Sequence, residues 1–305
     1  MRWRNHPGWR LPRTLVRVRS RTVLASFVAV TVLVTVAVYA VWQRVSKDLP
    51  LRLPTSRECM VATGGELRVD LNAEQMANAA TISAVAIRRG LPRYAVVVAL
   101  ATAWQESKRF NLAGGDRDTI GLFQQRPSQG WGSPEKLNDP RYAAGAFYTS
   151  LLKVPGWQEM RVTDAAQAVQ RSAHPELYEQ WADDAEIMAQ ALTGEVAGAV
   201  HCTLDIEPSG DGTAAAQGLA AALKLDWGSN VRAAVEPAVV GVTVRNDKAG
   251  WQYAHWLVSH AADHRVRKVR FGSQEWTARS GSWAKSSEPP NGGGGERVVA
   301  ELSSS

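Results

Sequence analysis

The residue best placed for acid–base chemistry is Glu106, within Trp104-Gln105-Glu106-Ser107. It follows residues 94–104, which are apolar nearly all round and therefore predict a buried helix. Burial disfavours the carboxylate, and a helix C-terminus is the negative end of the helix dipole, so both effects raise the pKa of a glutamate there. A carboxylic acid still protonated near neutral pH can protonate a leaving oxygen. The alternative is a solvated glutamate at a helix end.

A loop rich in glycine follows this glutamate. Residues 109–138 contain five glycines and two prolines with few regularly spaced apolar residues, and long ordered loops are often functional. Asp116 and Asp118 lie in it and offer a second carboxylate, although aspartate beside glycine is also typical of plain turns. Trp131 and Trp157 stand in glycine- and proline-rich surroundings, where an exposed ring could stack on a sugar; partial burial in the core is the alternative.

Three short motifs occur in a fixed order: Glu106-Ser107, then Gly121-Leu122-Phe123-Gln124, then Ala168-Val169-Gln170-Arg171-Ser172. This order resembles the Glu-Ser, Gly-Leu-Met-Gln and Ala-Tyr-Asn-Ala-Gly motifs of lytic transglycosylases and goose-type lysozymes. The resemblance covers roughly residues 75–193 and is closest to an actinobacterial membrane-anchored type. Phe123 replaces the methionine of the motif, and Gln170 replaces its asparagine.

The resemblance implies a lysozyme-like fold, mainly α-helical, that acts on the glycan strands of peptidoglycan. Glu106 would protonate the oxygen between N-acetylmuramic acid and N-acetylglucosamine, and no cofactor or metal would be needed. The expected substrate-binding residues are Ser107, Gly121, Leu122, Phe123, Gln124, Gln170 and Trp131.

The outcome of the reaction depends on a second carboxylate. Hydrolysis needs one to stabilise the oxocarbenium ion or to activate water, and goose-type enzymes place such an aspartate where Asp116 and Asp118 lie. A lytic transglycosylase needs none, because the 6-hydroxyl of muramic acid attacks. Both outcomes therefore remain open at this stage, as does a non-catalytic peptidoglycan-binding or envelope scaffold protein with a degenerate cleft.

The N-terminal part of the chain predicts a single membrane span. Residues 23–42 carry no charge and are long enough for the hydrocarbon core, whereas a signal peptide has a shorter apolar region. Seven arginines and no acidic residue precede this span, so the positive-inside rule places residues 1–22 in the cytoplasm as a basic tail. Residues 43–58 would be a stalk, with everything beyond it outside the cytoplasm. The net charge of +6 owes much to these arginines, and we expect no nucleic-acid partner.

Cys59 and Cys202 are the two cysteines of the chain, and they bracket the lysozyme-like domain predicted for residues 59–204. An extracytoplasmic location permits a disulfide between them, with two separate thiols as the alternative. Within the domain, Asn72 and Gln75 have the spacing of a capping box, and further helices are expected from Pro92, Asp139, Thr163 and Pro175.

Residues 205–215 read as a linker before a small α+β domain, predicted for residues 216–305 and ending in a flexible tail. Helices are expected at 214–225 and 251–262, and strands at 238–244, 266–271, 274–277 and 297–302. His255, His260 and His264 lie near one helix. They lack a Glu-x-x-His pattern or a third ligand, which indicates a solvated helix face rather than zinc. Residues 251–283 loosely resemble the end of a metallopeptidase-like module, whose metal ligands are not evident here.

Overall fold

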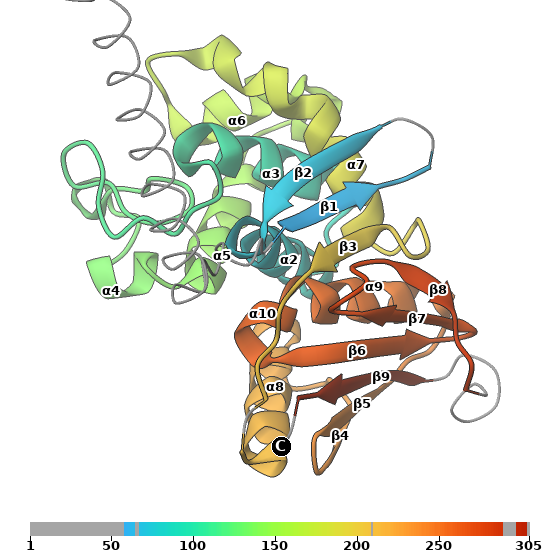
Figure 1. The fold of residues 1–305 in the computed structure, drawn as a ribbon. Coiled ribbons are helices and arrows are strands. Elements are labelled where there is room, and N and C mark those ends of the chain that lie inside the picture. The colour runs from blue at the N-terminus through green and yellow to red at the C-terminus, as the bar shows by residue number, and fades with distance from the viewer. Residues whose placement is uncertain (1–57, 65–66, 209, 289–296, 304–305) are drawn as a thin grey trace, which may run out of the picture. The chain divides into compact units, whose positions relative to one another are not determined.

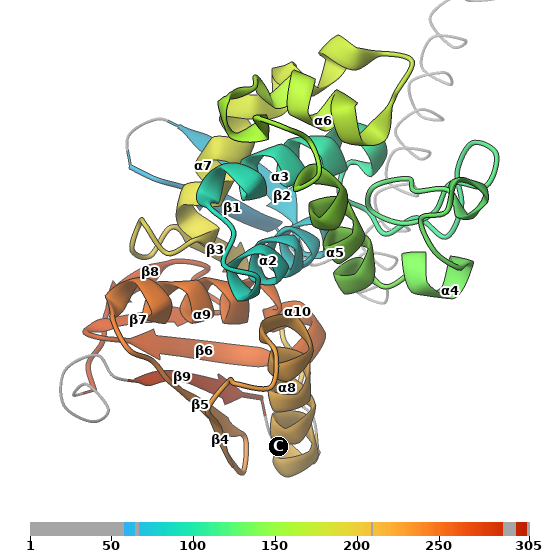
Figure 2. The same cartoon turned by 180° about the vertical axis from the view of Figure 1, so that it is seen from behind.

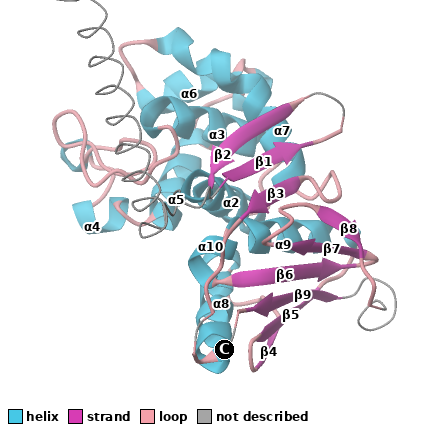
Figure 3. Ribbon diagram, viewed as in Figure 1, coloured by secondary structure: helices cyan, strands magenta, loops and turns pink. Residues whose placement is uncertain are grey.

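A computed structural model describes residues 58–64, 67–208, 210–288 and 297–303, which all belong to one compact unit. The predicted cytoplasmic tail, the membrane span and the stalk up to residue 57 lie outside these residues, as does the predicted tail segment 289–296. Among the helices that the structure does describe, none is both long and apolar enough to cross a membrane. The described chain combines helices with sheets and contains a small sheet domain, as expected (Figures 1 and 3).

The helical region surrounds two long helices, α2 (Ala73–Arg88) and α3 (Arg93–Ser107). The remaining helices are α4 (Pro134–Leu137), α5 (Pro140–Leu151), α6 (Val162–Gln170) and α7 (Ala182–Leu192). Short 3₁₀ turns span Pro127–Gln129, Trp157–Glu159 and Pro175–Trp181. Helix α3 packs against α2, α5, α6 and α7, so it is the central helix that its apolar sequence predicted (Figure 2).

The first turn of α2 is stabilised by side chains that accept hydrogen bonds from its backbone amides. The Asn72 side chain accepts from the backbone N–H of Gln75 at 2.9 Å, and the Gln75 side chain accepts from that of Asn72 at 3.0 Å. Pro92 proves to be the N-cap of α3 rather than a first-turn residue. The helix expected from Pro175 begins as a 3₁₀ turn and becomes α-helical only at Ala182, where α7 starts.

A three-stranded antiparallel sheet joins the two ends of this helical region. Its strands are β1 (Glu58–Ala62), β2 (Arg68–Asn72) and β3 (Val200–Thr203), in the order β2-β1-β3. Cys59 lies directly opposite Cys202 in this sheet, and the two are bonded with a Cα–Cα distance of 4.0 Å, which confirms the predicted disulfide. Closing a loop of 143 residues stabilises the fold by about 5 kcal/mol in the chain-entropy picture.

The C-terminal region is a six-stranded antiparallel sheet with helices on one face. The strand order is β4-β5-β9-β6-β7-β8, so the last strand lies in the middle. The elements are α8 (Gly212–Trp227), β4 (Ala233–Glu236), β5 (Val239–Thr243), α9 (Asp247–Ser259), α10 (Ala261–His264), β6 (Val266–Phe271), β7 (Gln274–Thr277), β8 (Trp283–Lys285) and β9 (Arg297–Leu302). Strands β6, β7 and β9 have the predicted bounds, whereas α8 begins inside the segment expected to be a linker.

The prediction of a solvated histidine face is wrong. His255 is fully buried and His260 nearly so, because α9 packs against α2 and α7 of the helical region. The Nδ1–H of His255 donates to the Ala191 carbonyl at 2.8 Å, and its Nε2 accepts from the Ala199 amide at 3.0 Å. Burial lowers the pKa of His255 to about 4, so this imidazole is a neutral structural bridge.

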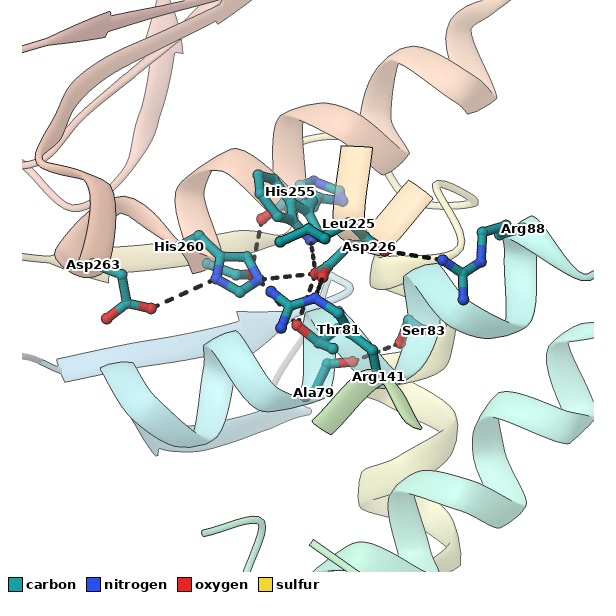
Figure 4. A network of polar contacts seen from close by, with 12 residues as sticks. Ala79, Thr81, Ser83, Arg88, Arg141, Leu225, Asp226, His255, His260 and Asp263 are labelled. Carbon is teal, nitrogen blue, oxygen red and sulfur yellow. Dashed lines mark hydrogen bonds and ion pairs between the residues drawn. The ribbon is translucent and has the colours of Figure 1, made fainter. Parts of the chain in front are cut away.

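Asp226 is the centre of a second polar contact between the two regions (Figure 4). It is fully buried near the end of α8. One carboxylate oxygen accepts from Arg141 Nε of α5 at 2.6 Å. The other accepts from Thr81 Oγ1 of α2 and from Trp256 Nε1 of α9, each at 2.8 Å. Three helices are thereby fixed to the end of α8.

Candidate functional site

Glu106 lies in the last turn of α3, where the buried helix meets the surface, as predicted. It is partly exposed, and Tyr178 Oη donates a hydrogen bond of 2.6 Å to its Oε1. The neighbouring Gln170 side chain also favours the charged form of this carboxyl. Burial raises the pKa of Glu106, and these two side chains lower it by less, so the net shift is upward. This carboxyl therefore keeps its proton to a higher pH than an exposed glutamate does.

The glycine-rich loop is attached directly to this end of α3. Ser107 Oγ lies 2.8 Å from the Leu122 carbonyl and 3.1 Å from that of Ala103, so one hydroxyl links the helix to the loop. Gly121 has a positive φ of 77°, and a Cβ there would lie 2.5 Å from the Leu137 carbonyl oxygen. Glycine is therefore required at this position by both conformation and space.

The side chains of the Gly-Leu-Phe-Gln motif pack in the core or form hydrogen bonds within the loop. Leu122 and Phe123 are fully buried, and Phe123 stacks on Phe147 with ring centroids 4.7 Å apart. Gln124 Nε2 donates to the Gly121 carbonyl, while its Oε1 accepts from Thr119. The structure thus places the backbone of this motif, rather than its apolar side chains, close to the site: Gln170 Nε2 donates to the Phe123 carbonyl at 2.8 Å.

The two candidate aspartates occupy different positions in the loop. Both carboxylate oxygens of Asp118 are engaged, one by Arg126 Nε and the other by the Ser128 amide, each at 2.8 Å. These hydrogen bonds hold the pKa of Asp118 well below its usual range. The side chain of Asp116 is 93% exposed. No carboxylate of the described chain is among the groups that shift the pKa of Glu106.

The backbone around this site is unusually strained. Seven described residues other than glycine have a positive φ, and five of them come from this site: Lys108, Arg109, Arg117, Gln124 and Arg171. Each such residue costs on the order of 1 kcal/mol or more, and such strain is concentrated at functional sites in proteins. Of these residues, Arg109 is buried against the Trp104 ring, and Lys108 lies over the Trp181 ring at 4.3 Å.

A groove of about 690 Å³ is lined in part by Gln170, the residue whose side chain also lowers the pKa of Glu106. Trp131 forms part of its wall, and Lys153 and Arg171 supply cations to it. The volume is in the range that holds one small ligand. Trp157, in contrast, is 3% exposed and stacks on Tyr94, so it belongs to the core.

Tyr178 was not predicted as a site residue. It lies 72 positions after Glu106, in the 3₁₀ turn before α7, and only the fold brings the two side chains together. Within the described residues, no three acidic, histidine or cysteine side chains gather closely enough to hold a metal ion.

Comparison with known proteins adds no assignment, since no protein-family model and no curated protein sequence matches this chain.

Proposed function

We propose that this chain is a membrane-anchored enzyme that cleaves the glycan strands of peptidoglycan outside the cytoplasm, with Glu106 as its acid. The observation that carries the proposal is the environment of Glu106. Its carboxyl has a raised pKa, accepts a hydrogen bond from Tyr178, and neighbours Gln170, which lines a groove with an aromatic wall. A raised pKa combined with a specific geometry beside a groove is typical of catalytic acids. The order of the three sequence motifs supports the same function.

Lytic transglycosylation fits the site better than hydrolysis. Glu106 would donate its proton to the glycosidic oxygen as the bond from that oxygen to C1 of muramic acid breaks. The muramic 6-hydroxyl oxygen would then bond to C1 and return its proton to the Glu106 carboxylate, leaving a 1,6-anhydro end. This sequence consumes no water. A retaining hydrolase needs a second carboxylate about 5–5.5 Å away, and an inverting one needs it at about 6.5–9.5 Å. Asp118 is instead committed to Arg126 and Ser128.

The disulfide supports the proposed location. The Cys59–Cys202 bond closes the helical region, and such bonds persist in oxidising surroundings outside the cytoplasm. The uncharged residues 23–42 would supply the anchor, and the arginines before them the orientation.

The experiment compares the full chain with Glu106→Gln on purified sacculi. Glutamine keeps the shape of the side chain but has no transferable proton, so fragment release should fall about 10²–10⁴-fold. Mass spectrometry of the fragments should find 1,6-anhydro ends, whereas reducing ends would indicate a lysozyme. Equal rates for the two proteins would show that Glu106 is not the acid.

A second candidate, a glycan-binding scaffold without turnover, is favoured by one observation. The polar atoms of the Gln124 side chain are both engaged within its own loop. If the parent chain releases no fragments yet binds sacculi, this scaffold function replaces the enzymatic one.

A further inference from the structure

The groove beside Glu106 has a distinct charge. It is formed by the turn ending at Trp131, by the C-terminal end of α5 with the residues after it, and by the end of α6. Lys153 and Arg171 contribute two cations to its lining, and no acidic residue lines it. Both side chains belong to exposed residues, and neither forms an ion pair with any residue in the part of the chain that the structure describes. The groove therefore favours a ligand with negative charge.

The turn that carries Arg171 is fixed on both sides. Arg171 has a left-handed conformation with φ 53° and ψ 44°, and its amide donates to the Gln167 carbonyl at 2.9 Å. The Gln167 side chain then exchanges two hydrogen bonds with the backbone of Ser172, at 2.9 and 3.1 Å. The start of the Arg171 side chain is thus pre-oriented, which reduces the entropy lost when it binds a ligand.

The groove also contains a buried acceptor without a partner. Gln170 Oε1 forms no hydrogen bond with any described residue, although Nε2 of the same amide donates to Phe123. A buried unpaired acceptor costs about 1–3 kcal/mol, and an N–H group of a ligand would remove this cost. The groove thus combines an aromatic ring, two cations and Gln170 among its lining residues.

We propose that this groove binds the peptide stem of muramic acid, with Lys153 and Arg171 recognising its free carboxylates. The inference rests on the proposed function, and it adds that the enzyme prefers glycan that carries peptides over bare glycan. Muramic acid joins its stem through an amide, and the stem holds free carboxylates a few bonds farther on. The free carboxylates of the stem match the two cations of the groove, Lys153 and Arg171.

A direct binding test uses the full chain in detergent and two synthetic muramoyl peptides that differ only in their carboxylates, one with free acids and one amidated. Charge-assisted hydrogen bonds are stronger than neutral ones, so calorimetry should find the acid at least about tenfold tighter. Lys153→Gln with Arg171→Gln should abolish the difference. Lys153→Arg with Arg171→Lys should retain most of it, and Lys224→Gln, an exposed lysine of α8, should change nothing. Equal affinity of the parent for acid and amide would overturn the proposal.

A second measurement distinguishes between the negatively charged groups that the groove could bind. Removing the stems from sacculi with an amidase exposes the lactyl carboxylate of muramic acid. We expect the parent to cleave intact strands about tenfold faster than stripped strands, and the double glutamine variant to cleave both equally slowly. A preference for stripped strands would mean that the groove binds the lactyl carboxylate, and tighter binding of glycerol phosphate would mean that it binds phosphate. Either result would overturn the proposal that the groove binds the peptide stem. A parent that binds the acid probe selectively but cleaves nothing would refute the proposed function alone.

Discussion

At the residue scale, burial and hydrogen bonding act on Glu106 in opposite directions. Burial raises its pKa, while the side chains of Tyr178 and Gln170 stabilise the carboxylate and lower the pKa. Their partial cancellation leaves an acid that can both donate a proton and take it back. The proposed transglycosylation needs both steps from Glu106, and incomplete burial is compatible with both.

Tyr178→Phe removes one hydrogen bond that favours the charged form, so the pKa of Glu106 should rise further. The protonated acid then persists to higher pH, and the alkaline limb of the pH–rate profile should move upward. The rate at its optimum should fall about tenfold, since the carboxyl also loses its orientation. Tyr148→Phe is the matched control, because its Oη donates to the Ile82 carbonyl away from the site. An unchanged alkaline limb in Tyr178→Phe would refute the role of this hydrogen bond.

The raised pKa of Glu106 should also change how protein stability depends on pH, which can be measured without an activity assay. The pKa of Glu106 in the folded state lies above the ordinary value of 4.5. The folded parent therefore loses stability as the pH rises from 4.5 through the pKa of Glu106 in the folded state. Glu106→Gln has no such loss. Urea unfolding should therefore show that the free energy of unfolding of the variant, relative to that of the parent, increases between pH 4 and pH 7. A difference that stays constant with pH would mean that burial does not raise the pKa of this carboxyl.

The sequence could reveal Glu106 because its signals are local: an apolar helix, its end and a nearby motif. Tyr178 could not be found this way, since its contact spans 72 positions and a tyrosine in a polar turn carries no distinctive pattern. For Asp118, the sequence indicated a carboxylate in a functional loop, and only the fold shows that Arg126 and Ser128 engage both of its oxygens.

At the element scale, the loop after α3 depends on one glycine. Gly121→Ala would place a Cβ 2.5 Å from the Leu137 carbonyl at a positive φ. We expect a loss of about 2 kcal/mol or more in unfolding free energy, together with lower activity, because the loop must move. Gly90→Ala is the control: it has a similar φ of 68° but open space around it, so only about 1 kcal/mol of backbone strain applies. Equal losses in the two variants would show that the contact with Leu137 is unimportant.

Strands were predictable where their pairing is local. Strands β6 and β7 form a hairpin, and their bounds follow from the sequence. Strand β9 was also recognised, although its central place in the sheet was not. Strands β1 and β3 were missed, because each has at most five residues and they pair across a separation of 143 residues. The predicted Cys59–Cys202 disulfide indicated that these two segments meet, but not that they pair as strands.

At the scale of the whole described unit, buried polar groups join the helical region to the C-terminal sheet. His255 links α7 and the start of β3, while Asp226 links α2, α5 and α9 to α8 (Figure 4). Buried charges are costly unless they are fully paired, so these contacts favour the docked arrangement of the two regions. The sequence predicted two domains and a linker; in the structure, α8 and α9 of the C-terminal region pack against α2.

Replacing Asp226 by alanine tests these contacts. The change leaves the Arg141 guanidinium, the Thr81 hydroxyl and the Trp256 indole N–H without their shared acceptor. Breaking a buried pair by removing one partner costs about 3–5 kcal/mol, so the midpoint of urea unfolding should fall sharply. Asp70→Ala is the control, since its ion pair with Arg68 is exposed and should contribute less than about 1 kcal/mol. Because Asp226 joins the two regions, hydrogen exchange should accelerate in α2 and α9 together. A loss below about 1 kcal/mol, or faster exchange in α9 alone, would mean that the C-terminal region folds and docks without Asp226.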